Sequence, residues 1–174
     1  MRLKYEIMTK KAALIAFLLV GLSSLVAGAD ATKLPVEQQV SDVVNSPRTT
    51  VVHVWATWCP NCKAEFASGG WKEAIEANPD TNFVFVTLWS ENDGREILAR
   101  YGIGPQKNFT LVGHPSHARA MKDRVKSFMG LSVPWIPTTW IFKGGQMHYA
   151  LNYGEMHFSI LQQFITDSSN SWAR

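Results

Sequence analysis

The sequence predicts an α/β protein in which helices flank both faces of a central mixed β-sheet. Three observations support this prediction. Runs of β-branched and aromatic residues alternate with segments whose apolar residues recur at helical spacing. Two later strand-like runs are separated by a glycine-rich turn and followed by a last helical segment. With 174 residues, of which 46% are hydrophobic and 18% charged, the chain can form one domain around its own core.

The predicted strands are continuous apolar runs. Residues 49–56 and 82–89 are rich in valine, threonine and aromatic side chains, which is typical of buried strands. Residues 109–112 form a shorter candidate strand. Residues 138–142 and 147–151 flank a Lys-Gly-Gly-Gln turn, which predicts a β-hairpin.

The predicted helices follow from apolar residues three or four positions apart and from helix start signals. The longest begins at Cys59, has Pro60 in its first turn and is expected to bend at Gly69-Gly70. Ser90 followed by Asp93 resembles a capping box. The expected helices cover residues 36–44, 59–77, 91–101, 117–129 and 158–165.

The first 29 residues have the pattern of a secretory signal peptide. Residues 1–11 are positively charged, residues 12–26 are apolar apart from two serines, and Ala27-Gly28-Ala29 supplies the small residues of a cleavage site. Cleavage would leave residues 30–174 as a single predicted domain. The alternative is an uncleaved anchor, because residues 12–29 approach the roughly 20 residues that cross a bilayer. Both interpretations place the folded part in the periplasm or another extracytoplasmic space.

The distribution of charge excludes one class of partner. The formal net charge is +3, and residues 1–29 account for all of it, with four basic side chains against one acidic one. Residues 30–174 therefore hold equal numbers of basic and acidic side chains. Without an overall basic field, we do not expect a nucleic-acid partner.

The two cysteines form a Cys59-Pro60-Asn61-Cys62 motif that follows a predicted strand and opens a predicted helix. Unpaired N–H groups and the helix dipole at a helix N-terminus stabilise a thiolate. Two intervening residues allow the second sulfur to reach the first. We therefore predict that Cys59 is an exposed nucleophile and that Cys62 is a buried thiol that resolves a mixed disulfide.

Three other interpretations of the cysteine pair compete with redox chemistry. A zinc site would need histidine ligands, and the only closely spaced pair, His114 and His117, has a proline between its members. Covalent haem attachment needs a histidine directly after the second cysteine, where this chain has Lys63. A purely structural disulfide would close a loop too short to stabilise the fold much. No metal or organic cofactor is expected.

Residues 54–65 (VWATWCPNCKAE) and 135–142 (WIPTTWIF) resemble the active-site stretch and the later proline loop of thioredoxin-fold proteins. The resemblance is closest to the extracytoplasmic TlpA/ResA/DsbE-like branch, whose members act in cytochrome c maturation and related thiol reduction. It implies a thioredoxin fold from about Val36 to Thr166. It also implies that Pro137 is a cis-proline facing the redox pair and that Ile136 offers backbone groups to a substrate. An ordinary trans proline at a strand start is the alternative.

Further residues around the two motifs have candidate roles, and Glu65, His53 and Trp135 each have a structural alternative. Glu65 would be an acid/base beside Cys62, or else a solvated glutamate favoured by the helix dipole. His53 stands where thioredoxins often have a buried aspartate. It would gate protons, or simply be a hydrogen-bonded core residue. Pro60 and Asn61 would tune the redox potential, and the neutral Asn61 favours a reductant. Trp135 would form an apolar wall for a partner, or belong to the core.

We therefore predict an extracytoplasmic thiol:disulfide oxidoreductase that reduces protein disulfides and is itself reduced by a membrane thiol reductase. One alternative is an oxidant of the same fold that donates its disulfide. Another is a peptide-binding assembly factor that uses the fold only for docking. Members of the DsbE branch typically have an acidic residue after the cis-proline, where this chain has Thr138, so a dedicated role in cytochrome c maturation is not implied.

Overall fold

The computed structural model describes residues 35–152 and 156–170. The predicted signal peptide, residues 1–29, lies outside the described residues. Within these two ranges, the helices are all too short or too polar to cross a lipid bilayer.

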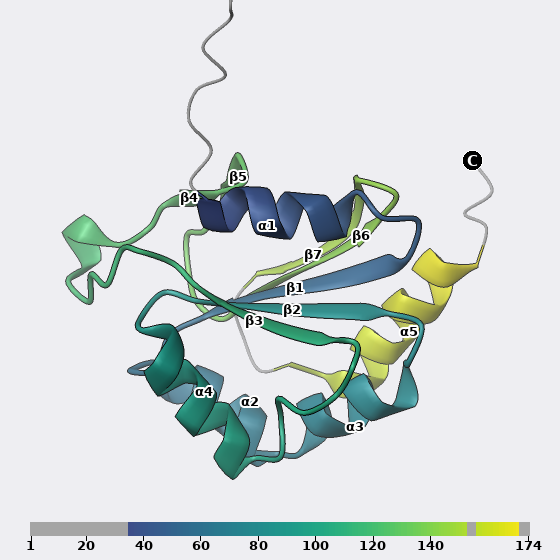
Figure 1. Ribbon diagram of the computed structural model, residues 1–174, viewed down its shortest axis with the longest axis horizontal. Coiled ribbons are helices and arrows are strands. Elements are labelled where there is room, and N and C mark those ends of the chain that lie inside the picture. The colour runs from purple at the N-terminus through teal and green to yellow at the C-terminus, as the bar shows by residue number, and fades with distance from the viewer. Residues whose placement is uncertain (1–34, 153–155, 171–174) are drawn as a thin grey trace, which may run out of the picture. The chain divides into compact units, whose positions relative to one another are not determined.

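A five-stranded mixed sheet with the order β3-β2-β1-β6-β7 forms the centre of the fold (Figure 1). The two neighbouring pairs that involve β2 are parallel, and the two pairs that involve β6 are antiparallel. Each predicted strand is present, with ends shifted by at most two residues. The strands are β1 (Thr49–Trp55), β2 (Asn82–Thr87), β3 (Phe109–Gly113), β6 (Thr138–Lys143) and β7 (Gln146–Asn152).

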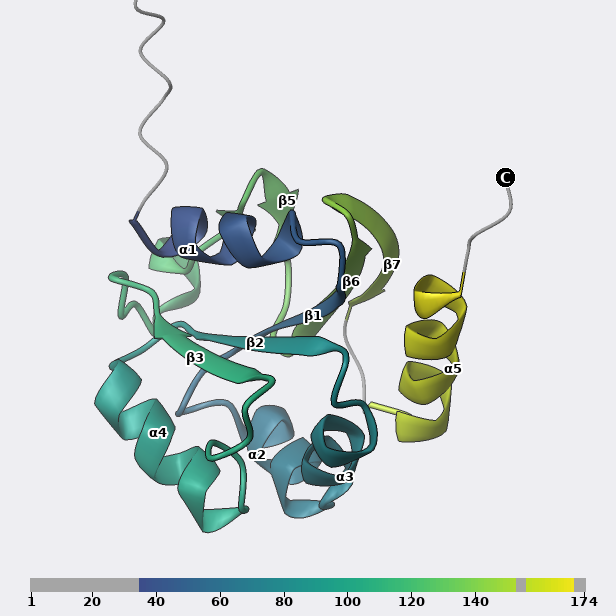
Figure 2. The same ribbon diagram turned by 45° about the vertical axis from the view of Figure 1, so that its right-hand side comes forward.

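Helices cover both faces of this sheet, as predicted. Figures 1 and 2 show α1 on one face and α2, α3 and α4 on the other, while α5 packs against α3 and the strands β1 and β6. The helices are α1 (Pro35–Val44), α2 (Pro60–Ala67), α3 (Gly70–Ala77), α4 (Glu91–Arg100) and α5 (Phe158–Ser169).

The long helix predicted after Cys59 is broken into α2 and α3 at the predicted glycine pair. Gly69 has φ +81°, a left-handed conformation that glycine adopts without the steric cost of a Cβ atom. Gly70 begins α3, and its Cα lies so close to the ring of Phe158 that a Cβ atom there would overlap the ring. The break therefore allows α3 to turn and pack against α5.

The helix predicted over residues 117–129 is wrong. The segment instead forms a short 3₁₀ turn (Met121–Asp123) and a two-stranded ribbon of β4 (Ser127–Phe128) and β5 (Leu131–Ser132). The helical spacing was misleading because its apolar residues do not share a buried face: Phe128 is fully buried, but Met121 is 69% exposed. A helix without a buried apolar face gains little from tertiary packing.

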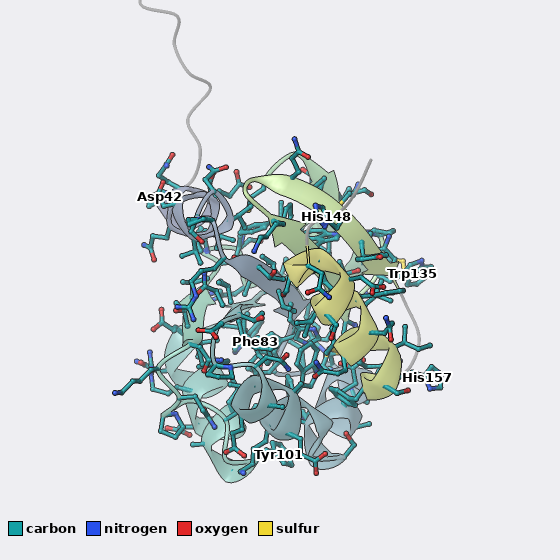
Figure 3. All side chains as sticks on the ribbon, turned by 90° about the vertical axis from the view of Figure 1, so that its right-hand side faces the viewer. Asp42, Phe83, Tyr101, Trp135, His148 and His157 are labelled. Atoms are coloured by element: carbon teal, nitrogen blue, oxygen red, sulfur yellow. A yellow bond between two sulfur atoms is a disulfide. The ribbon has the colours of Figure 1, made fainter. Side chains whose placement is uncertain are left out.

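The core lies on both sides of β1 and β2, and every residue of β1 is buried. Large aromatic side chains fill it, including Trp55, Trp71, Trp140 and Phe83. Phe83 is seen inside the molecule in Figure 3, where Trp135 lies at its edge. Because β1 is buried on both faces, its position in the core is fixed. The cysteine motif begins four residues after β1 ends, so the strand also positions the motif.

Candidate active site

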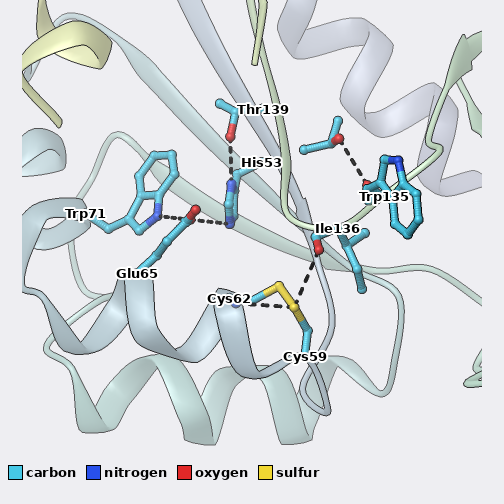
Figure 4. The surroundings of a disulfide bond; sticks show 9 residues. His53, Cys59, Cys62, Glu65, Trp71, Trp135, Ile136 and Thr139 are labelled. Carbon is cyan, nitrogen blue, oxygen red and sulfur yellow. Dashed lines mark hydrogen bonds and ion pairs between the residues drawn. A yellow bond between two sulfur atoms is a disulfide. The ribbon is translucent and has the colours of Figure 1, made fainter. Parts of the chain in front are cut away.

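The cysteine pair forms a disulfide at the N-terminus of α2 (Figure 4), with a Cα–Cα distance of 5.4 Å. Cys59 is the N-cap residue, and its sulfur accepts a hydrogen bond from the backbone N–H of Cys62 at 3.2 Å. Pro60 occupies the first helical position, where no N–H is needed, and both Pro60 and Asn61 are exposed. The capping geometry directs helix N–H groups toward the sulfur of Cys59, which stabilises negative charge there.

The two sulfurs differ in exposure less than predicted. Cys62 is fully buried, as expected, but Cys59 is only 3% exposed, so the expectation of an exposed Cys59 is wrong. The physical reason is the neighbouring loop: the carbonyl oxygen of Ile136 lies 3.8 Å from the sulfur of Cys59. In a reduced protein, the Cys59 thiol could donate a hydrogen bond to that oxygen.

The loop before β6 brings the second sequence motif to the disulfide. The Ile136–Pro137 peptide bond is cis. Antiparallel pairing of β6 with β1 places Thr138 opposite Val54, which fixes this loop beside the start of α2. The hydroxyl of Thr138 donates a hydrogen bond to the carbonyl oxygen of Trp135 at 3.1 Å. The Trp135 side chain is 52% exposed, so its alternative placement in the core is wrong.

His53 lies fully buried on β1, beneath the active-site helix. Its Nδ1 atom shares a hydrogen bond of 2.9 Å with the hydroxyl of Thr139, the residue opposite it on β6. Its ring packs against Trp71 and Phe85, with centroid distances of 4.5 and 4.8 Å. Burial lowers the pKa of His53 to about 3, so the imidazole is neutral near pH 7.

Glu65 is 3% exposed, which makes the expectation of a solvated glutamate wrong. The indole N–H of Trp71 donates a hydrogen bond to its Oε2 atom at 3.1 Å, and the same oxygen lies 3.8 Å from Nε2 of His53. Figure 4 shows the carboxylate pointing toward these two rings. The structure thus joins a carboxylate and a neutral imidazole in one buried network beside the disulfide.

Two members of this network were missed by sequence reasoning. Thr139 could have been found, because pairing of the hairpin strand with β1 places it opposite His53. Trp71 could not, because it reaches Glu65 across the break between α2 and α3, and the angle of that break is not encoded in residue spacing.

The described ranges contain no group of three or more histidine, cysteine, aspartate or glutamate side chains that could hold a metal ion.

Comparison with solved structures decides the fold. The chain is similar to a secreted Mycobacterium tuberculosis disulfide oxidoreductase homologous to E. coli DsbE, with 19% sequence identity, a TM-score of 0.52, and coverage of 70% of this chain and 82% of that one. A DsbE-like thiol:disulfide interchange protein described as putative, from Chlorobium tepidum, gives 21% identity, a TM-score of 0.53, and coverage of 75% and 85%. The chain has a thioredoxin fold.

This thioredoxin fold is the one that the two motifs predicted. A thioredoxin from Neisseria meningitidis, also described as putative, gives a TM-score of 0.53 at 20% identity, covering 76% of this chain and 83% of that one. No model of a known protein family matches the sequence, and no curated protein does. The likeness therefore establishes the fold alone.

Proposed function

We propose that this protein is a thiol:disulfide oxidoreductase of the TlpA/ResA/DsbE-like kind, acting through Cys59 and Cys62. The observation that carries the proposal is a disulfide that caps α2 beside the Ile136–Pro137 loop. This arrangement combines a stabilised thiolate with backbone groups that an extended substrate can pair with. A docking module would need no such cysteine pair.

The reaction transfers two electrons from the dithiol to the substrate. The Cys59 thiolate attacks one sulfur of a substrate disulfide, and the other sulfur leaves as a thiolate that takes up a proton. Cys62 then loses its proton, and its thiolate attacks the Cys59 sulfur of the mixed disulfide. The Cys59–Cys62 disulfide forms, and the second substrate sulfur leaves as a thiolate. Ile136, Pro137 and Trp135 bind the substrate around the bond that breaks.

The buried network supplies a path for the Cys62 proton. Glu65 lies one helical turn after Cys62 and accepts the proton in this proposal. Trp71 orients its carboxylate through the indole N–H bond to Oε2, and Nε2 of His53 lies 3.8 Å from the same oxygen, beyond hydrogen-bond distance. His53 is a positioning residue here, because its Nδ1 side is held by Thr139 while its Nε2 side faces the carboxylate.

The proposed direction is reduction of protein disulfides. Asn61 is neutral and exposed between the cysteines, and it stabilises a thiolate less than a histidine would. A protein that reduces disulfides needs electrons from another thiol protein. We propose that a membrane thiol reductase supplies them. The signal-like residues 1–29 support an extracytoplasmic location, either after cleavage or with residues 12–29 as a membrane tether.

Two cysteine variants test the activity. The protein, secreted by a bacterial host, is assayed for reduction of insulin and of a small disulfide. Cys59→Ser is expected to lower both rates to background, and Cys62→Ala is expected to trap mixed disulfides with substrate proteins. Full activity in Cys59→Ser would overturn the proposal.

The reduction potential of the Cys59–Cys62 pair tests the direction. Reference values run from about −270 mV for thioredoxin to about −120 mV for a strong periplasmic oxidant. A value below about −220 mV supports a reductant. A value above about −150 mV would make the protein a disulfide donor instead.

A further inference from the structure

A pocket of about 420 Å³ lies beside the cis-proline loop. It is built mainly by the segment between β3 and β6, residues 114–137, in place of the helix that the sequence predicted there. Its walls are mostly apolar: Leu88 and Val133 are buried, while Met121 and Trp135 are 69% and 52% exposed. Pockets of this size accept a bulky apolar side chain together with part of its backbone.

Two contacts connect the pocket to the disulfide. Ile136 lines the pocket, and its carbonyl oxygen lies 3.8 Å from the sulfur of Cys59. Arg124 also lines it, and its guanidinium carbon lies 4.8 Å from the ring centroid of Trp58, the residue before Cys59. A chain that occupies the pocket therefore passes next to the reactive sulfur.

The charged side chains that line the pocket are both cationic. They are Arg124 and Lys126, and no lining residue is acidic. Among the described residues, no carboxylate forms an ion pair with either of them. Residues 119–126 hold four basic side chains against one acidic one, whereas residues 30–174 as a whole are neutral. The positive charge is thus concentrated at this pocket.

We propose that the pocket binds a segment of the protein substrate in which a bulky apolar side chain is flanked by acidic residues, close to the substrate cysteine. The proposal rests on the proposed function and names the substrate class that it favours. Burial of the apolar side chain gives affinity. The acidic flank pairs with Arg124 and Lys126, which gives specificity and speeds association.

Binding is tested first without any redox chemistry. Two cysteine-free peptides share one leucine-phenylalanine core; one has glutamates on its flank and the other has lysines. Calorimetry with the protein as secreted by a bacterial host is expected to give a Kd about tenfold lower for the acidic peptide at low salt. The difference should shrink in 0.5 M salt, where exposed charges are screened.

A pair of charge-reversed variants locates the effect. R124E/K126E is expected to reverse the preference between the two peptides. R100E/K107E changes the net charge by the same amount at exposed positions outside the pocket lining and is expected to keep the preference. If R124E/K126E keeps the wild-type preference, or if neither peptide binds the wild type, the proposal fails. Binding of anionic vesicles in place of either peptide would also overturn it.

Measuring the rate of disulfide reduction then distinguishes failure of the docking proposal from failure of the proposed function. The same peptides, each carrying a mixed disulfide at a cysteine beside the core, are used as substrates for wild type and R124E/K126E. The ratio of kcat/KM for the acidic peptide to that for the lysine peptide is expected to fall by more than about tenfold in the variant, from above one to below one. If the wild type binds the acidic peptide but reduces no disulfide, the proposed function fails while the docking proposal stands. Equal reduction of both peptides, with no binding preference, overturns only the docking proposal.

Discussion

Two regions of the molecule meet at the disulfide, and they differ in almost every physical respect. Residues 49–67, which form β1 and α2, are regular and carry the buried network of His53 and Glu65. Residues 114–137 are mostly irregular, partly exposed and positively charged. In the proposals above, the first region holds the groups that move electrons and protons, and the second forms the surface that a partner meets. The comparison indicates that the reactive groups of one site can lie on regular secondary structure while the surface proposed to bind the partner is irregular.

The largest expected difference between the regions is in stability. Phe66 is fully buried against Trp55, with a centroid distance of 4.8 Å, so Phe66→Ala should lower the free energy of unfolding by about 3–5 kcal/mol. Met121 is exposed, so Met121→Ala should change it by less than about 0.5 kcal/mol. Urea titration measures both. Equal losses would break the comparison, because Met121 would then be packed as tightly as Phe66.

The next effect is a dependence of stability on pH. His53 has a pKa lowered from 6.5 to about 3 in the folded protein, so only the unfolded chain takes up a proton between these values. Stability therefore falls as the pH drops, by about 2 kcal/mol between pH 7 and pH 5. Burial also lowers the pKa of His114 in the second region, which acts in the same direction.

Variants separate the two histidines. In His53→Asn, the loss of stability between pH 7 and pH 5 should become much smaller, whereas His114→Gln should retain most of it. Urea titrations at the two pH values give the answer. A pH dependence that survives in His53→Asn would assign the proton uptake to other groups.

A smaller effect comes from the Glu65–Trp71 hydrogen bond. Glu65→Ala leaves the buried indole N–H of Trp71 without this acceptor, at a cost of about 1–3 kcal/mol. Glu65→Gln keeps an oxygen that can accept the bond and should be more stable than the alanine variant. The glutamine variant should still lose the rise in reduction rate with pH that follows deprotonation of Glu65, because an amide cannot act as a base. An unchanged pH–rate profile would leave Glu65 with a structural role only.

Sequence reasoning succeeded where local signals and burial agree. The strands around Val54 and Phe85 were predicted from continuous apolar runs, which the structure buries on both faces. The start of α2 was predicted at the cysteine motif, where a proline and a capping side chain act locally. The approach of the loop that contains Ile136 and Pro137 to Cys59 was expected from the family resemblance.

Sequence reasoning failed where tertiary packing decides. Helical spacing is shared by four apolar residues, Ala118, Met121, Val125 and Phe128. They do not form one buried face, and the chain reverses direction at Met129 and Gly130. The burial of Glu65 depends on where Trp71 lies after the helix break. Neither fact is encoded in a short window of sequence.

A further small effect should be similar at two glycines, one just after the first region and one in the second. Gly69, between α2 and α3, and Gly130 have φ values of +81° and +74°, and a Cβ atom at either would meet nothing within 4 Å. Alanine at each position should cost about 1 kcal/mol from backbone conformation alone. Thermal unfolding of the two variants measures this. A much larger loss at Gly130 would mean that the irregular segment is held more tightly than its exposure indicates.

The irregular segment is held at its ends by strand pairing, through β3 at the sheet edge and β6 next to β1. Closing a loop costs only about 0.6 kcal/mol more each time its length doubles. Insertions or deletions between these anchors therefore cost little in loop closure, provided that the buried Phe128 and the Ile136–Pro137 loop keep their places. If the segment selects the partner as proposed, grafting it onto a related scaffold should transfer that preference while the recipient keeps its own electron chemistry.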